Sequence, residues 1–459
     1  MSPAEFNRAV DTCRERLRRD PRDVDALNSL GNLLANAGHL DASQSAYEHA
    51  AAVRPDVPQL HLNLGNLLQR RGRHEQARVC FSKALELQPD YPEAWNNLGN
   101  ALQDLAEIDR AIDAYRRAIE LRADFPEPHN NLGLALRKLD RHADAVEAFE
   151  RALDINPAYA AAIVNRGLAL RSLERHAEAL REFDRALQLT PNAAAVWCFK
   201  GAALMEAGDA RGGCEALERS LALEPFNRTA LAYRMAVMPE LDENPEPPVL
   251  RDLDRHVADH DVSCPTAYES LSAFNEALAR HVRAHPTLSE QAAGRATRHG
   301  EHTGNLLIGD KGPVAALEQI IAESVRQYLA RPPMHPAHPY AQFQLPQWRL
   351  VAWAVVMSSG GHQIPHIHAA GWLSGVYYVR LPGCVGESAE GDAGWIEFGR
   401  PPDSLHCRAE PVTRRICPRE GRLLIFPSYY YHRTIPFESE EPRISIAFDV
   451  LPTAPPGRA

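Results

Sequence analysis

Glycine recurs every 34 residues through the first half of the chain, and other positions keep the same period. The glycines are Gly31, Gly65, Gly99, Gly133, Gly167 and Gly201. A small residue follows each glycine after 12 positions, and a large residue comes 4 positions later. The large residues are Tyr47, Phe81, Tyr115, Phe149, Phe183 and Leu217. A period of this length predicts stacked helical units, because one unit cannot bury its apolar face alone.

These positions resemble the tetratricopeptide repeat, a helix–turn–helix unit of 34 residues. The resemblance covers residues 24–227 in six repeats, and residues 1–23 are expected to form a capping helix. It implies an α-solenoid with a concave groove. Such a groove usually binds an extended peptide or a helix of a partner, so we expect a protein or peptide there.

An asparagine stands two residues before four successive repeat glycines, and we expect these side chains to line one stripe of the inner helices. They are Asn63, Asn97, Asn131 and Asn165. Their amides can hydrogen-bond the backbone of an extended peptide, as in the similar superhelix of the O-linked N-acetylglucosamine transferases. Alternatively, they only cap or solvate the helices, and the groove holds no ligand.

Charge and composition exclude several classes of protein. The net charge of −10 argues against a nucleic-acid partner, which favours a basic surface. The sequence has no run of 18 apolar residues, so no membrane span is expected. The 8 cysteines form no C-x-x-C pair, which indicates neither a zinc ribbon nor a disulfide framework. We therefore expect a cytoplasmic protein.

The repeat pattern ends after Pro225, and a segment rich in proline and acidic residues follows at 239–248. We expect a helical linker at residues 228–289, with helical patterns at 249–258 and 266–284. A further helical stripe covers residues 313–330. From Tyr340 onward the pattern changes to that of strands.

Three histidines and an arginine stand among these strand-like segments. His366 and His368 follow a β-rich run at residues 348–356 and a turn signal at 358–361. His432 comes 64 residues after His368, and Arg443 comes 11 residues after His432. Residues i and i+2 of a strand share one face, so we expect His366 and His368 to point the same way into a barrel.

The segments around these residues resemble a bacterial and phage subgroup of the 2-oxoglutarate- and Fe(II)-dependent oxygenases. The shared motifs are H-x-H at 366–368, S-G-V-Y-Y at 374–378, G-R-L-L-I-F-P-S at 421–428, H-R-T-I-P-F at 432–437 and R-I-S-I-A-F at 443–448. The resemblance covers residues 290–451, where residues 296–306 resemble a helical lead-in, and leaves 452–459 as a tail. It implies a double-stranded β-helix, of jelly-roll or cupin-like type, with flanking helices. The fold class is then α followed by α+β.

The resemblance also implies the roles of individual residues. His366 and His432 would bind Fe(II), and Arg443 and Tyr378 would bind the distal carboxylate of 2-oxoglutarate. Members of this class carry Asp or Glu two residues after the first histidine, where this chain has His368. Three alternatives stay open: His368 is a third ligand, it points away from the metal, or the site binds metal poorly.

The combined expectation is a 2-oxoglutarate-dependent dioxygenase that uses Fe(II) and O2. We expect it to hydroxylate a protein or peptide that the repeats recruit. A small-molecule oxygenase whose repeats only oligomerise is an alternative. A scaffold with a degenerate oxygenase domain is another.

Overall fold

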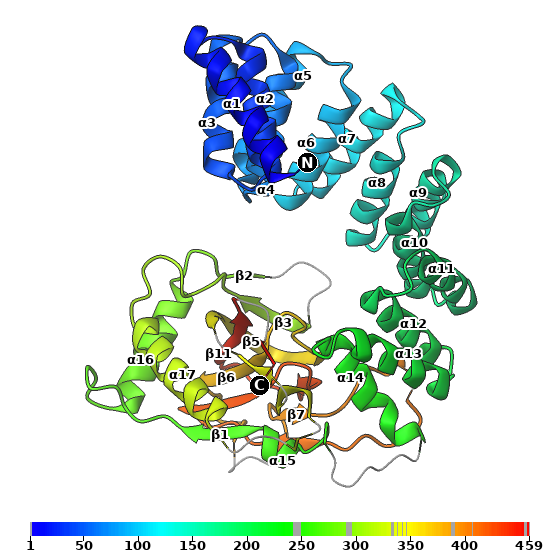
Figure 1. The fold of residues 1–459 in the computed structure, drawn as a ribbon. Coiled ribbons are helices and arrows are strands. Elements are labelled where there is room, and N and C mark those ends of the chain that lie inside the picture. Colours follow the sequence, from blue (N-terminus) through cyan, green and yellow to red (C-terminus); the bar gives the residue numbers. More distant parts are fainter. Residues whose placement is uncertain are drawn as a thin grey trace. The chain divides into compact units, whose positions relative to one another are not determined.

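Pairs of helices make up the first half of the chain, and their boundaries repeat every 34 residues (Figure 1). A single helix, α1 (Pro3–Arg19), precedes them. The first helices of the pairs are α2 (Val24–Asn36), α4 (Pro58–Arg70), α6 (Pro92–Asp104), α8 (Pro126–Lys138), α10 (Ala160–Ser172) and α12 (Ala194–Glu206). The second helices are α3 (Leu40–Val53), α5 (His74–Leu87), α7 (Ile108–Leu121), α9 (His142–Ile155), α11 (His176–Leu189) and α13 (Ala210–Leu223).

Each repeat glycine lies against the large residue that follows it in the sequence. A Cβ atom added to Gly65 would come within 2.5 Å of the Phe81 ring, and Gly31 has the same relation to Tyr47. Both rings are buried. The glycine is therefore needed for the close approach of the two helices in a pair, which is the physical basis of the sequence period.

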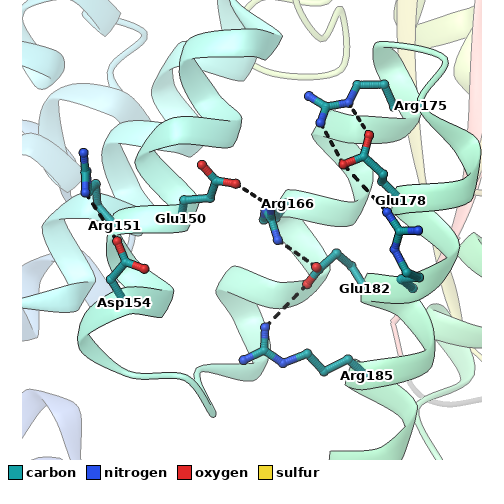
Figure 2. A network of polar contacts seen from close by, with 9 residues as sticks. Glu150, Arg151, Asp154, Arg166, Arg175, Glu178, Glu182 and Arg185 are labelled. Atoms are coloured by element: carbon teal, nitrogen blue, oxygen red, sulfur yellow. Dashed lines mark hydrogen bonds and ion pairs between the residues drawn. The ribbon is translucent and has the colours of Figure 1, made fainter.

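The fifth repeat replaces one apolar contact by a network of ion pairs (Figure 2). The residue before the repeat glycine is leucine in the first four repeats and Arg166 in the fifth. Arg166 contacts Glu182 of α11 at 2.7 Å and also pairs with Glu150 of α9. Arg185 lies 3.8 Å from the other oxygen of Glu182. The guanidinium thus links two neighbouring repeats at a position where the first four repeats have a leucine.

The computed structural model describes residues 2–241, 249–290, 296–331, 335–336, 338–341, 343–345, 347–386, 391–405, 407–453 and 457–458. The chain forms two compact units, residues 1–191 and 192–459. The domain limits expected from the sequence, at residues 23, 227, 289 and 451, stay predictions. Most of the expected acidic connection, residues 242–248, lies outside the described residues. None of the helices in the described segments combines the length and apolar composition that a membrane span requires.

The second unit contains a curled antiparallel sheet and the helices around it (Figure 1). Besides α12 and α13, its helices are α14 (Arg228–Val237), η1 (Met238–Leu241), α15 (Leu253–His256), α16 (Leu271–Arg283), α17 (Val314–Leu329), η2 (Pro339–Ala341) and η3 (Asp403–Leu405). Its strands are β1 (Ala258–Asp261), β2 (Ser289–Glu290), β3 (Thr297–His302), β4 (Phe343–Gln344), β5 (Trp348–His366), β6 (Leu373–Arg380), β7 (Ile396–Phe398), β8 (Arg414–Ile416), β9 (Arg422–Pro427), β10 (His432–Thr434), β11 (Arg443–Pro452) and β12 (Gly457–Arg458).

The order of strands in the main sheet is β1-β9-β6-β11-β5-β10-β7-β8, and β3 also pairs with β5. Strand β11 is hydrogen-bonded to β5 on one side and to β6 on the other. The far end of β5 turns to pair with β10. The sheet therefore curls as in a jelly-roll-like domain, which the sequence predicts. Helices α16 and α17 contribute Phe274, Leu278, Leu317 and Val325 to the core under the sheet.

Three local expectations were wrong. Residues 296–306 do not form a helix, because β3 (Thr297–His302) pairs with β5. The helix expected at 249–258 shortens to α15, and Ala258–Asp261 pairs with β9 as a strand. The turn expected at 358–361 is a distortion inside one long strand, β5, where Gly360 has a φ of +74°. In each case hydrogen bonds to a distant strand override the local pattern.

A cluster of histidines and tyrosines fills the core beside the end of β9. His338 Nε2 lies 2.8 Å from Tyr429 Oη, and His256 Nδ1 lies 2.6 Å from Tyr430 Oη. The backbone N–H of Tyr340 donates to His338 Nδ1 at 3.0 Å. That contact requires an unprotonated Nδ1, so His338 is neutral. Burial lowers the pKa of His338 to about 3 and that of His256 to about 4.

This cluster predicts acid sensitivity. Between pH 3 and the ordinary histidine pKa of about 6.5, the unfolded chain binds protons that the folded chain excludes, so stability falls as pH decreases. Each histidine should lower the free energy of unfolding by about 2 kcal/mol at pH 5 relative to pH 7. Urea denaturation at the two pH values measures this loss. The variant His338→Gln should lose part of the pH dependence, and an unchanged dependence would contradict the assignment.

Candidate functional site: three imidazoles and a buried guanidinium

The imidazoles of His366, His368 and His432 converge inside the curled sheet. A ligand atom from each lies within 4.8 Å of the other two. Ring centroids are 4.3 Å apart for His366 and His432, and 5.1 to 5.2 Å apart for the pairs that include His368. His366 ends β5, His432 begins β10, and the two residues face each other in the register of these antiparallel strands. Residues far apart in the sequence are thus joined by strand pairing.

The Nδ1 atom of each ring is already engaged, which leaves Nε2 for a metal ion. Nδ1 of His366 lies 2.8 Å from the carbonyl oxygen of Ile364, and Nδ1 of His432 lies 3.0 Å from that of Tyr430. A carbonyl oxygen only accepts, so Nδ1 carries the proton in both rings and Nε2 keeps its lone pair. Three such nitrogens close together form a donor set that suits a divalent transition metal.

His368 reaches the cluster by a different route from the one expected. Strand β5 ends at His366, so the two histidines do not share a strand face. The backbone N–H of His368 donates to the carbonyl oxygen of Ser428 at 3.1 Å, which fixes the loop. Its Nδ1 lies 2.7 Å from Oδ1 of Asp449 in β11. The ring therefore joins the cluster from the loop between β5 and β6.

Burial keeps the two strand histidines uncharged. It lowers the pKa of His366 to about 4, with a further contribution from His368. The pKa of His432 lies well below its ordinary value for the same reason, with contributions from the other two rings. Neutral imidazoles are the form that binds a metal, so no proton has to be displaced at neutral pH.

Arg443 and Tyr378 lie together elsewhere in the same cavity. The side chain of Arg443 is buried, and its guanidinium carbon lies 5.2 Å from the centre of the Tyr378 ring. Neither Arg443 Nε nor the Tyr378 hydroxyl has a hydrogen-bond partner in the described part of the chain. Burial lowers the pKa of Arg443 and raises that of Tyr378 to about 12. A buried cation and a free hydroxyl that face a cavity are suited to bind an anion.

One cavity of about 290 Å³ connects these groups. The three histidines, Tyr378 and Arg443 all line it. Its apolar wall consists of Trp353, Val355, Ile367, Val376, Ile396 and Phe426. A polar part of its wall consists of Thr297, His302, Gln363 and Thr434. The cavity is therefore apolar over much of its surface and carries histidine, arginine and tyrosine groups at defined places.

Asp449 and Ser445 were not identified from the sequence, although a signal for both was present. Alternate residues of a strand share one face, so Ser445 and Asp449 lie on the same side of β11 as Arg443. The alternation of side chains along β11 therefore predicts that Ser445 and Asp449 share a face with Arg443. Nothing local in the sequence indicates that Asp449 meets His368, because that contact joins the end of β11 to a loop 81 residues earlier.

The four asparagines of the repeats lie in a chain of amide contacts. Each Nδ2 donates to an asparagine of the preceding repeat: Asn63 to Asn28 at 2.8 Å, Asn97 to Asn66 at 2.8 Å, Asn131 to Asn96 at 3.0 Å and Asn165 to Asn130 at 3.0 Å. The amides thus link successive repeats. Their binding of a peptide backbone stays a prediction.

Comparison with protein families agrees with both halves of this description. Residues 351–449 match the family model described as "Putative 2OG-Fe(II) oxygenase". Residues 24–57, 56–124 and 130–194 match models of the tetratricopeptide repeat. None of the curated proteins matches the chain.

Solved structures similar to the chain include several repeat proteins. The APC/C hetero-tetramer Cut9-Hcn1 matches at 19% identity and a TM-score of 0.46, over 51% of this chain and 46% of that one. YrrB, described as a TPR protein with an unusual peptide-binding site, matches at 23% identity and a TM-score of 0.36, over 41% and 97%. PilF of Pseudomonas aeruginosa matches at 19% identity and a TM-score of 0.42, over 47% and 99%. By the family models, the chain combines segments within residues 24–194 that match the tetratricopeptide repeat with a segment at residues 351–449 that matches a 2OG-Fe(II) oxygenase model.

Proposed function

We propose that the second unit is an Fe(II)- and 2-oxoglutarate-dependent dioxygenase. The observation that supports this most strongly is that three imidazoles and a buried guanidinium, which has no carboxylate partner among the described residues, line one cavity. His366, His368 and His432 would hold Fe(II) through Nε2. Bound Fe(II) would couple the conversion of 2-oxoglutarate and O2 to succinate and CO2 with insertion of one oxygen atom into a C–H bond.

The residues of the chain would perform three tasks around that metal. Arg443 would pair with the distal carboxylate of 2-oxoglutarate, since a guanidinium can donate two parallel hydrogen bonds. Tyr378 would donate its hydroxyl to the same carboxylate. The apolar wall of the cavity would exclude water, which strengthens these charge interactions.

The metal assignment is tested by removing ligands one at a time. His366→Ala and His432→Ala should each abolish Fe(II)-dependent succinate formation and should also weaken binding of Co(II), measured by competition with a chelator. His362→Ala is a matched control, because His362 also lies in β5 but does not line the cavity. Normal Co(II) binding in both His366→Ala and His432→Ala would refute the assignment.

The assignment of Arg443 and Tyr378 to 2-oxoglutarate binding predicts that their variants have a higher KM for 2-oxoglutarate. Arg443→Lys keeps a charge but loses the planar pair of donors, and should raise the KM for 2-oxoglutarate about 10- to 100-fold. Tyr378→Phe should raise it about tenfold, with a smaller change in kcat.

Tyr377→Phe provides the control for these variants. The Tyr377 hydroxyl donates to Asn275 of α16 at 2.6 Å, on the other face of β6. This variant should leave the KM for 2-oxoglutarate unchanged. Equal KM values for the Tyr378→Phe and Tyr377→Phe variants would remove Tyr378 from the proposed site.

We further propose that the substrate is a protein or peptide recruited by the repeats. Support comes from the repeat architecture, whose groove typically binds such partners. A chain that lacks residues 1–191 keeps the whole second unit, including α12 to α14. It should keep metal binding but lose most of its activity on the native substrate.

Mass spectrometry of proteins captured by the full-length chain measures the result directly. The captured substrate should gain one oxygen atom only when Fe(II), O2 and 2-oxoglutarate are present. Undiminished modification by the shortened chain would contradict recruitment by the repeats, whereas oxygen gain on none of the captured proteins would favour a small-molecule oxygenase.

A further inference from the structure

Asp449 is an acidic residue beside the histidine cluster, and the chemistry proposed above does not use it. It lies six residues after Arg443 on the same face of β11, and the exposed fraction of its side chain is 14%. Its Oδ1 atom lies 2.7 Å from Nδ1 of His368. The other two rings direct Nδ1 to backbone carbonyl oxygens, which carry no formal charge. Among the three imidazoles, His368 is therefore the one that contacts a carboxylate of a described residue.

The carboxylate of Asp449 is itself held in place. The hydroxyl of Ser374 in β6 donates to the same Oδ1 at 2.6 Å, and Ser374 is buried. Ser374 and Asp449 face each other in the register of β6 and β11, so the contact is built into the sheet. On the other side, the ring of Trp353 lies 5.5 Å from that of His368, centre to centre. The His368 ring is thus held by Asp449 of β11 and Trp353 of β5, and Ser374 of β6 holds Asp449 in turn.

This arrangement decides which nitrogen of His368 faces the other two rings. An ionised carboxylate only accepts, so Nδ1 of His368 must donate and Nε2 keeps the lone pair. A ligating imidazole that donates to a carboxylate is held in one orientation and becomes a stronger electron donor to the metal. Because His368 lies in a loop, strand geometry alone does not orient its ring.

We infer that Asp449 is a positioning residue for His368, and that it supplies the negative charge that a carboxylate ligand would otherwise bring to the metal. This inference rests on the proposed metal site. It assigns to the Ser374–Asp449–His368 chain the function of presenting Nε2 of His368 to the ion. Imidazole ligands would bring no negative charge to the metal, and the Asp449 carboxylate would act on it through the hydrogen bond to His368.

The test measures the affinity of the metal-free, full-length chain for Co(II) by competition with a chelator. Asp449→Asn removes the charge with little change of shape, and should weaken Co(II) binding about 10- to 100-fold. Ser374→Ala removes a single donor to Asp449 and should weaken binding in the same direction but less. Each metal-free variant is also melted, and an unchanged Tm shows that the effect does not arise from unfolding.

Asp449→Glu separates orientation from charge. It keeps the negative charge but moves the carboxylate by one methylene group, so a positioning role predicts weaker binding in this variant as well. Wild-type affinity in Asp449→Glu, with weak binding in Asp449→Asn, would reduce the effect to charge and overturn the positioning role. If Asp449→Asn does not fold, Asp449→Glu and Ser374→Ala carry the test.

The outcomes also separate this inference from the proposed function. Wild-type affinity in both Asp449→Asn and Ser374→Ala, with loss of binding in His366→Ala, would overturn the role of Asp449 and leave the metal site intact. Equal Co(II) binding by the wild type, His366→Ala and His432→Ala would overturn the metal site, and the inference with it.

Discussion

Arg443 is buried with no carboxylate partner in the described part of the chain, and this is the constraint on which the rest of the site depends. Moving a charged side chain out of water costs several kcal/mol even after the protein relaxes around it. The surrounding sheet has to supply that free energy. Strand β11 does so by pairing along its length with β5 and with β6, both of which contribute to the core. A carboxylate ligand that enters the cavity would recover part of the cost, and the site therefore favours anions.

The sequence predicts the features that repeat or alternate and misses those that depend on distant partners. The repeats could be found because the contact of Gly65 with Phe81 recurs within each unit of the period. The convergence of His366 and His432 could be anticipated only through resemblance, since their meeting depends on the register of β5 with β10. The resemblance of residues 296–306 to a helical lead-in predicts a helix at β3, because the pairing of β3 with β5 leaves no local signal.

The two kinds of architecture in this chain suit different tasks. The repeats join neighbour to neighbour, through glycine–aromatic packing and through the amide chain that includes Asn97 and Asn131. Such local contacts give an extended surface whose parts are nearly equivalent. The curled sheet instead brings together residues that are far apart in the sequence, such as His368 and Asp449, which are separated by 81 positions. A chemically specific site requires this second kind of contact.

Charge balance gives a physical reason for the position of Asp449. A divalent metal and the Arg443 guanidinium together bring three positive charges, and 2-oxoglutarate brings two negative ones. With three neutral imidazoles as ligands, the cavity would keep one positive charge that is largely shielded from water. The Asp449 carboxylate would neutralise it without occupying a coordination position. A histidine in place of the carboxylate ligand is therefore compatible with a neutral site, provided that a carboxylate lies behind that histidine.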